Sequence, residues 1–135
     1  MPDKLKLLDP EFVVYAKTML DELKTQDFKY HVEWGFRTKI EQARLFSMGR
    51  IQEAAAGFTR NRPGESFHNY GMAIDVHPVV GGRTRKGHPR LESELAAIGK
   101  KAGLVWGGDF TPPEPQHFQM PGVTLKQLQE KAKKK

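Results

Sequence analysis

Apolar residues recur at helical spacing directly after the dipeptide Asp9-Pro10. These apolar positions are Phe12, Val13, Ala16, Met19, Leu20 and Leu23. Asp9 is a favoured N-cap residue, and Pro10 suits the first helical position because a proline has no N–H to leave unsatisfied there. The pattern therefore predicts an amphipathic helix that begins at Pro10 and ends near Thr25.

The next segment, FKYHVEWGF (residues 28–36), alternates between apolar and polar positions. Its apolar positions are Phe28, Tyr30, Val32, Trp34 and Phe36. A period of two is typical of a β-strand with one buried face, because successive side chains point to opposite faces of a sheet. The segment therefore predicts a strand, with His31 on its solvent face.

A second helix is predicted immediately after this strand. Thr38 and Glu41 have the spacing of a capping box, in which each side chain accepts a hydrogen bond from the other residue's backbone N–H. Apolar residues continue the pattern until about Gly49. Arg37 therefore lies at the junction of strand and helix. Residues 50–67 contain glycine and proline without periodicity, and we expect them to form a loop over a site.

The second half of the chain alternates short strands with helical patterns. MAIDV is a predicted strand, VGGRTRKGHP a turn-rich connection and RLESELAAIGKKAG a helix that ends at Gly103. LVW and HFQM are predicted strands on either side of TPPEP. Thr124 and Gln127 form another capping box, which predicts a C-terminal helix. We expect the lysine-rich tail, residues 131–135, to fray. Because no repeat or linker divides the chain, we predict one α+β domain over residues 1–135.

Composition narrows the function classes. The chain has 135 residues, no cysteine and a formal net charge of +6. A basic protein favours polyanions such as nucleic acid, anionic lipid or an acidic cell wall. We see no nucleic-acid-binding motif and exclude that partner. There is no run of about 18 apolar residues, so we expect no membrane insertion. The N-terminus has no apolar signal-peptide core, so we also expect no export signal.

The motif SFHNYGMAIDVHP contains the strongest candidate chemistry. In the predicted strand, Asp75 and His77 share one face, and burying an unpaired carboxylate there costs several kcal/mol. Asp75 therefore needs a partner. His68 precedes it by seven positions, and a turn at Gly71 can bring the two side chains together. Without cysteine, a zinc site must use histidine and carboxylate ligands.

A catalytic zinc site needs a third protein ligand. The remaining histidines are His31, His77, His88 and His117. His117 is favoured because Glu114, three positions upstream, can act as a general base. His77 is the alternative, since it shares a strand face with Asp75, whereas we expect His31 and His88 to be exposed. From the spacing alone, an Asp–His hydrogen bond that braces a loop explains the motif equally well.

Four motifs in order resemble one enzyme family, the zinc D-Ala-D-Ala carboxypeptidases and L-alanyl-D-glutamate endopeptidases of peptidase family M15. SFHNYGMAIDV resembles the family signature S-x-H-x-x-G-x-A-x-D. GFRTKIEQARLFSMGR resembles the segment before it, and GLVWGGDF with the later HFQ resembles its C-terminal part. The resemblance extends from about Trp34 to Gln119. It implies a small domain with a mainly antiparallel sheet flanked by helices, as in these peptidases and the hedgehog signalling domain.

The resemblance also implies roles for individual residues. It implies that zinc is held by His68, Asp75 and His117. Glu114 matches the general base, and Arg37 matches the arginine that stabilises an oxyanion or a substrate carboxylate. The family often has aspartate where this chain has Glu114, so Asp109 is the rival base. Further substrate-side candidates are Ser66, Gln42, Tyr70, Trp106 and Asp109.

We therefore expect a monomeric zinc peptidase that cuts the L-Ala–D-Glu bond of the peptidoglycan stem peptide. The resemblance is closest to phage lysins, which are made in the host cytoplasm and reach the wall once the membrane opens. One alternative is a D-alanyl-D-alanine carboxypeptidase. A second is a non-catalytic, zinc-braced binding domain, but Glu114 and Arg37 argue against it because neither is needed to hold the metal.

Overall fold

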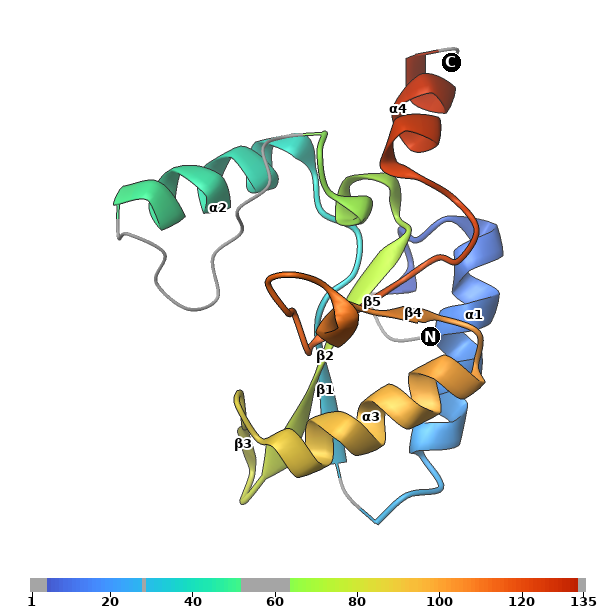
Figure 1. Ribbon diagram of the computed structural model, residues 1–135, viewed down its shortest axis with the longest axis vertical. Coiled ribbons are helices and arrows are strands. Elements are labelled where there is room, and N and C mark those ends of the chain that lie inside the picture. The colour runs from blue at the N-terminus through green and yellow to red at the C-terminus, as the bar shows by residue number, and fades with distance from the viewer. Residues whose placement is uncertain (1–4, 28, 52–63, 134–135) are drawn as a thin grey trace.

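The structure is a computed structural model that describes residues 5–27, 29–51 and 64–133 (Figure 1). Its elements, in chain order, are α1 (Pro10–Leu23), β1 (Lys29–Trp34), α2 (Lys39–Ile51), the 3₁₀ helix η2 (Phe67–Tyr70), β2 (Ala73–Val80), β3 (Arg83–Thr84), α3 (Pro89–Lys101), β4 (Val105–Trp106), the 3₁₀ helix η3 (Gly107–Asp109), β5 (His117–Gln119) and α4 (Leu125–Lys133).

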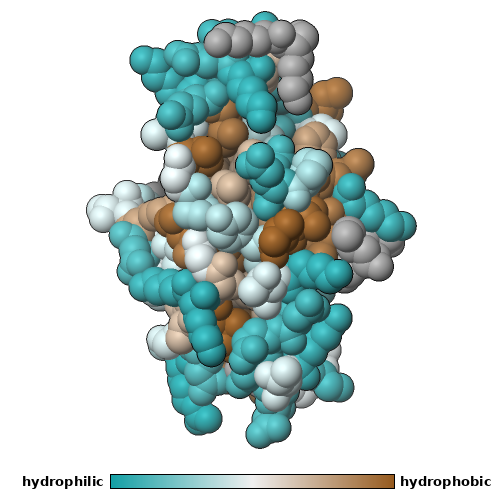
Figure 2. Space-filling view, turned by 90° about the vertical axis from the view of Figure 1, so that its right-hand side faces the viewer, coloured by the Kyte–Doolittle hydropathy of each residue, from teal (hydrophilic) through white to brown (hydrophobic). Residues whose placement is uncertain are grey.

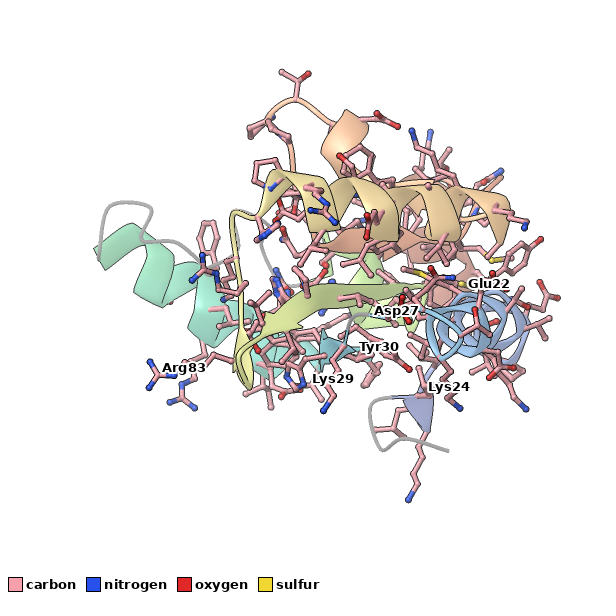
Figure 3. All side chains as sticks on the ribbon, turned by 90° about the horizontal axis from the view of Figure 1, so that it is seen from below. Glu22, Lys24, Asp27, Lys29, Tyr30 and Arg83 are labelled. Carbon is pink, nitrogen blue, oxygen red and sulfur yellow. The ribbon has the colours of Figure 1, made fainter. Side chains whose placement is uncertain are left out.

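The strands form one antiparallel sheet. Its order is β1-β2-β5-β4, and β3 pairs with the end of β2. The last strand in the sequence, β5, therefore lies between β2 and β4. Figure 3 shows α3 across one face of β2, with Lys29 and Tyr30 at the start of β1 and Arg83 at the far tip of the β2–β3 hairpin. This arrangement confirms the expected α+β fold with an antiparallel sheet.

The core lies between the sheet, α1 and α3. The apolar face predicted for α1 is buried there, and Phe12 and Met19 are fully inaccessible. Gly99 lets α3 approach β5 closely, because a Cβ at this position would lie 2.4 Å from the ring of Phe118. Figure 1 shows α1 and α3 beside the sheet, whereas α2 and α4 project from the end of the molecule near η2. The packing of α1 and α3 thus covers the central strands, and neither of these two helices covers the end near η2.

The helix caps agree with the sequence analysis. Asp9 Oδ1 accepts from the backbone N–H of Glu11 at 2.9 Å. Both capping boxes form, since Thr38 and Glu41 bond reciprocally, as do Thr124 and Gln127. These local signals were sufficient because each involves residues only two or three positions apart.

Several boundaries differ from the expectation. Helix α2 extends to Ile51, and β2 extends to Val80, with both faces buried over most of its length. The turn-rich connection contains the short strand β3. Helix α4 continues to Lys133, into the tail for which we expect fraying. Phe28, most of the predicted loop at 50–67 (residues 52–63) and the last two lysines lie outside the described residues.

The face of the molecule shown in Figure 2 is mainly hydrophilic. In Figure 2, apolar residues appear as separate patches among hydrophilic ones. In the part of the chain that the structure describes, no helix is long and apolar enough to cross a bilayer.

Candidate metal centre

Three side chains meet beside the sheet, two from the SFHNYGMAIDVHP motif and one from β5. Asp75 on β2 lies directly opposite His117 on β5 in the antiparallel register, and His68 approaches from η2. Each offers one ligand atom, and these atoms lie within 4.8 Å of one another. All three side chains are buried. The pair of histidine nitrogens and one carboxylate oxygen is a donor set that suits zinc.

Helix η2 fixes His68 through local hydrogen bonds. Ser66 is its N-cap, and the Ser66 hydroxyl accepts from the backbone N–H of His68 at 3.2 Å. Asn69 completes a capping box with Ser66. Gly71 ends the helix at φ +68°, and a Cβ there would lie 2.7 Å from the backbone nitrogen of Asp9. The turn between His68 and Asp75 therefore requires glycine, both for its conformation and for its space.

The hydrogen bonds of both imidazoles turn a ring nitrogen of each histidine toward the Asp75 carboxylate. His68 Nδ1 donates to the carbonyl of Gly35 at 2.8 Å, so the neutral imidazole carries its lone pair on Nε2, 3.1 Å from Asp75 Oδ1. His117 Nε2 donates to Gln119 Oε1 at 2.8 Å, and its Nδ1 lies 3.3 Å from the same carboxylate oxygen. Two lone pairs facing a carboxylate repel one another unless a cation lies between them. The residues present therefore fit a metal ion.

The electrostatics of the cluster lead to the same conclusion. Burial raises the pKa of the Asp75 carboxyl, but the charge of His68 and a hydrogen bond to His117 outweigh it and hold that pKa well below its usual range. Burial lowers the pKa of His117, and Asp75 more than compensates, so the net shift is upward. Both net shifts come from attraction between the Asp75 carboxylate and the two imidazoles, so the position favours positive charge.

Gln119 is a functional residue that the sequence analysis missed. It lies two positions after His117 on the same strand face. Its Oε1 bonds to His117 Nε2 and so orients the imidazole of that histidine. Partners of this kind fix the tautomer of a metal-binding histidine. The period-two pattern of HFQ was the available signal.

We expect Gln119→Leu to weaken zinc affinity by about 10- to 100-fold, because His117 loses the acceptor that holds its tautomer. Competition with a chromophoric chelator measures this directly. Gln119→Glu is the matched control, since it keeps an acceptor oxygen and should retain most of the affinity. Equal affinities of the wild-type and Gln119→Leu chains would rule out this role.

Arg37 lies beside the cluster, held by contacts on several sides. Its Nη1 donates to Gln42 Oε1 at 2.9 Å, its Nη2 lies 3.9 Å from Asp75 Oδ2, and its guanidinium lies 4.5 Å from the ring centroid of Trp34. Burial lowers the pKa of Arg37, and nearby carboxylates, including Asp75 and Glu114, oppose that shift. An arginine remains charged in this setting, so Arg37 supplies a positive charge beside the candidate metal ligands.

Glu114 lies at the exposed side of the site. Its backbone carbonyl accepts from the N–H of His117 at 3.0 Å, and its own N–H donates to the carbonyl of Gly107 at 2.8 Å. A Cβ on Gly107 would lie 2.4 Å from the Glu114 carbonyl oxygen and 2.8 Å from the Cβ of His117. Glycine at 107 therefore allows this turn to pack closely, with an exposed carboxylate next to a buried ligand.

The rival base, Asp109, has a different environment. It forms an ion pair with Lys100 at 3.0 Å, and its side chain is 60% exposed. Trp106 contacts the same lysine, with Lys100 Nζ 5.2 Å from the ring centroid. The indole N–H of Trp106 donates to the carbonyl of Pro115 at 2.8 Å. Trp106 thus braces the turn that carries Glu114, whereas the Asp109 carboxylate is paired with Lys100.

The other substrate-side candidates have structural partners. Ser66 is buried and caps η2. Gln42 is fully buried, and its Oε1 accepts from Arg37 Nη1, so it holds that arginine in place. The Tyr70 hydroxyl donates to the carbonyl of Gly64 at 2.7 Å, and burial raises its pKa. Asn69, which the sequence analysis did not single out, donates from Nδ2 to the carbonyl of Arg37 at 2.9 Å.

The remaining histidines lie outside the cluster. His77, the alternative third ligand, bonds from Nε2 to Glu33 Oε2 at 2.6 Å. His31 is exposed, as expected. His88 is half-buried and caps α3, because its Nδ1 accepts from the N–H of Leu91 at 3.2 Å. The expectation of an exposed His88 is therefore wrong, and its setting between glycine and proline reflects a helix start.

Comparison with known sequences matches this chain to a family model and to curated relatives. A family model described as D-alanyl-D-alanine carboxypeptidase, of peptidase family M15, matches residues 59–120. The peptidoglycan L-alanyl-D-glutamate endopeptidase CwlK of Bacillus subtilis (strain 168) is 35% identical over 85 residues, which cover 56% of this chain and 50% of that protein. The match thus spans about half the length of this curated relative.

Solved structures share the fold. The L-Ala D-Glu endopeptidase ChiX of Serratia marcescens has a TM-score of 0.64 at 21% identity and covers 93% of this chain and 86% of its own. A vancomycin resistance D,D-pentapeptidase, VanY, in complex with Zn(II), has a TM-score of 0.67 at 19% identity and covers 91% and 78%. At these identities the likeness shows the fold.

Proposed function

We propose that this chain, which belongs to the M15-like peptidases, is a zinc-dependent peptidoglycan peptidase that hydrolyses the L-Ala–D-Glu bond of the stem peptide. The observation that carries the proposal is the buried cluster of His68, Asp75 and His117 beside the carboxylate of Glu114 and the guanidinium of Arg37. A merely structural metal site would need neither of the last two groups.

His68, Asp75 and His117 would hold the zinc. When bound, the ion would supply Lewis-acid activation of water and of the scissile carbonyl. Three protein ligands leave a coordination position for water or substrate, as in catalytic rather than structural zinc sites. Gly35 and Gln119 would keep the two imidazoles in the tautomers that this requires.

Glu114 is the general base in this proposal. Its carboxylate accepts a proton from the attacking water as the new C–O bond forms at the carbonyl carbon. The same carboxyl group then donates that proton to the amine as the C–N bond breaks, so Glu114 ends the cycle ionised. Exposure at the open side of the site gives it access to both groups.

Arg37 stabilises the negative charge that develops on the carbonyl oxygen. Its contacts with Gln42 and Trp34 fix the guanidinium before substrate binds. A preorganised charge of this kind lowers the barrier because the protein need not reorganise during the reaction. Burial of Arg37 beside Asp75 strengthens the effect by excluding water.

The bond assignment rests on CwlK, whose name gives L-alanyl-D-glutamate endopeptidase activity. The description of the matching family model, D-alanyl-D-alanine carboxypeptidase, supports a second candidate. The finer proposal is a lytic, phage-type role in which bulk digestion of the wall breaks the cell.

We expect mass spectrometry of digested peptidoglycan to show new L-alanine C-termini, with glycan strands and terminal D-alanines intact. A single metal site with one base suits amide hydrolysis, whereas glycan cleavage requires a carboxylate pair around a sugar bond. Free D-alanine as the sole product would establish the carboxypeptidase alternative. New reducing ends would refute a peptidase, and a digest that leaves sacculi turbid would refute the lytic role.

A further inference from the structure

A cavity that includes Tyr70 of η2 lies outside the metal cluster. It has a volume of about 360 Å³, the size of a small-molecule site. Its lining consists of Lys39, Gly64, Tyr70, Gln129, Ala132 and Lys133. Figure 1 shows η2 between the start of α2 and the helix α4, the two elements that bring the lysines together.

The floor of this cavity is tied to the catalytic motif. The carbonyl of Gly64 accepts from the Tyr70 hydroxyl at 2.7 Å and from Gln129 Nε2 at 3.0 Å. The N–H of Gly64 donates to Asn69 Oδ1 at 3.0 Å, and Asn69 in turn bonds to the backbone carbonyl of Arg37. The cavity is therefore connected to the elements that carry His68 and Arg37.

The charge of the lining points to an anion. Lys39 and Lys133 contribute two ammonium groups, and the described lining contains no carboxylate. Gln129 adds a second amide N–H beyond the one that it donates to Gly64. Ordinary surface lysines face solvent alone, whereas these two flank a concave site with further donors. A carboxylate suits such a set of donors.

The separation between this cavity and the metal cluster limits which molecule can supply the anion. Gly64 precedes His68 by four residues, so their Cα atoms lie within about 14 Å, the reach of an extended tetrapeptide. A peptide with its scissile bond at the metal cluster can therefore place a carboxylate a few residues away in this cavity.

We propose that the Lys39/Lys133 cavity is an anion subsite that binds a carboxylate of the stem peptide, remote from the bond that is cut. The inference rests on the proposed function, because it assumes that a wall peptide occupies the metal site. Cleavage specificity would then depend on a charge outside the metal cluster.

The test measures binding without turnover. Calorimetry would compare a stem peptide with free carboxylates and the same peptide with those groups amidated, on the zinc-loaded Glu114→Gln chain. Adding Lys39→Gln and Lys133→Gln should weaken binding of the carboxylate peptide by roughly 3- to 20-fold, as expected for the loss of two exposed charge pairs. The amidated peptide should bind with the weaker affinity to both chains.

Lys17→Gln with Lys101→Gln is the matched control, since both lysines are exposed on α1 and α3 and the net charge changes equally. If the Lys17/Lys101 pair weakens peptide binding as much as the Lys39/Lys133 pair does, the effect comes from net charge and the subsite proposal is wrong. Inorganic phosphate provides another arm. If the Lys39/Lys133 change abolishes phosphate binding but leaves peptide binding intact, the cavity is only a small-anion site. Wall digestion by the wild-type chain is scored separately, so failure of the proposed function remains distinguishable.

Discussion

Glu114→Gln is expected to lower kcat by about 10²- to 10⁴-fold, because it removes the group that accepts the proton from water. The Glu114 side chain is exposed and makes no hydrogen bond with another described residue. Its backbone bonds to Gly107 and His117 do not depend on the carboxylate. The substitution should therefore leave zinc content and thermal stability unchanged. Hydrolysis of purified peptidoglycan, followed as released peptide ends, measures the loss.

Asp109→Asn is the control for this experiment. Its carboxylate pairs with Lys100 at the surface, so the variant should retain near-normal turnover. The opposite pattern, with an active Glu114→Gln chain and an inactive Asp109→Asn chain, would assign the base to Asp109. Loss of zinc from the Glu114 variant would show that this residue holds the metal instead.

His68→Ala is expected to abolish zinc binding and hydrolysis together. The substitution removes one of the protein ligands, and its effect on affinity should exceed the roughly 10- to 100-fold effect of losing a supporting partner. It also leaves Asp75 without the neighbour that holds its pKa low. Elemental analysis after dialysis should give one zinc per wild-type chain and none for the variant.

Thermal unfolding separates loss of the metal from loss of the fold. A bound metal stabilises the native state by mass action, so chelation should lower the Tm of the wild-type chain. The Tm of a folded His68→Ala chain should not respond to chelator. His31→Ala is the control, because His31 is exposed, and it should bind zinc and respond to chelation normally. A His68→Ala chain that folds and retains a full zinc ion would remove His68 from the site.

Local sequence features predicted the helices well. The Asp9 cap and the two capping boxes form as expected because each involves residues within one helical turn. The same logic could have found two further features. His88 precedes Pro89 as an N-cap, and Ser66 with Asn69 has capping-box spacing. Side-chain identity and short spacing are sufficient for such contacts.

Strand lengths were less accessible from the sequence. The expected strand MAIDV became Ala73–Val80, because β2 has β1 on one side and β5 and β3 on the other. Because β2 has a partner strand on each edge, its pairing continues beyond the apolar residues MAIDV. The face shared by Asp75 and His77 was also predicted, but it did not decide their roles. His77 meets Glu33 across the strand pair, while Asp75 meets His117.

The sequence by itself determined the α+β fold class, the helix caps and the motif residues that resemble a zinc peptidase. Only the tertiary structure decided which candidates meet. His117 joins His68 and Asp75 because β5, last in the chain, pairs between β2 and β4. Asp109 turns to Lys100, and Gln42 lies behind Arg37. The pairing of β5 with β2 joins Asp75 to His117 across tens of positions, and the other two pairings depend on how the helices and turns pack, so spacing along the chain does not encode them.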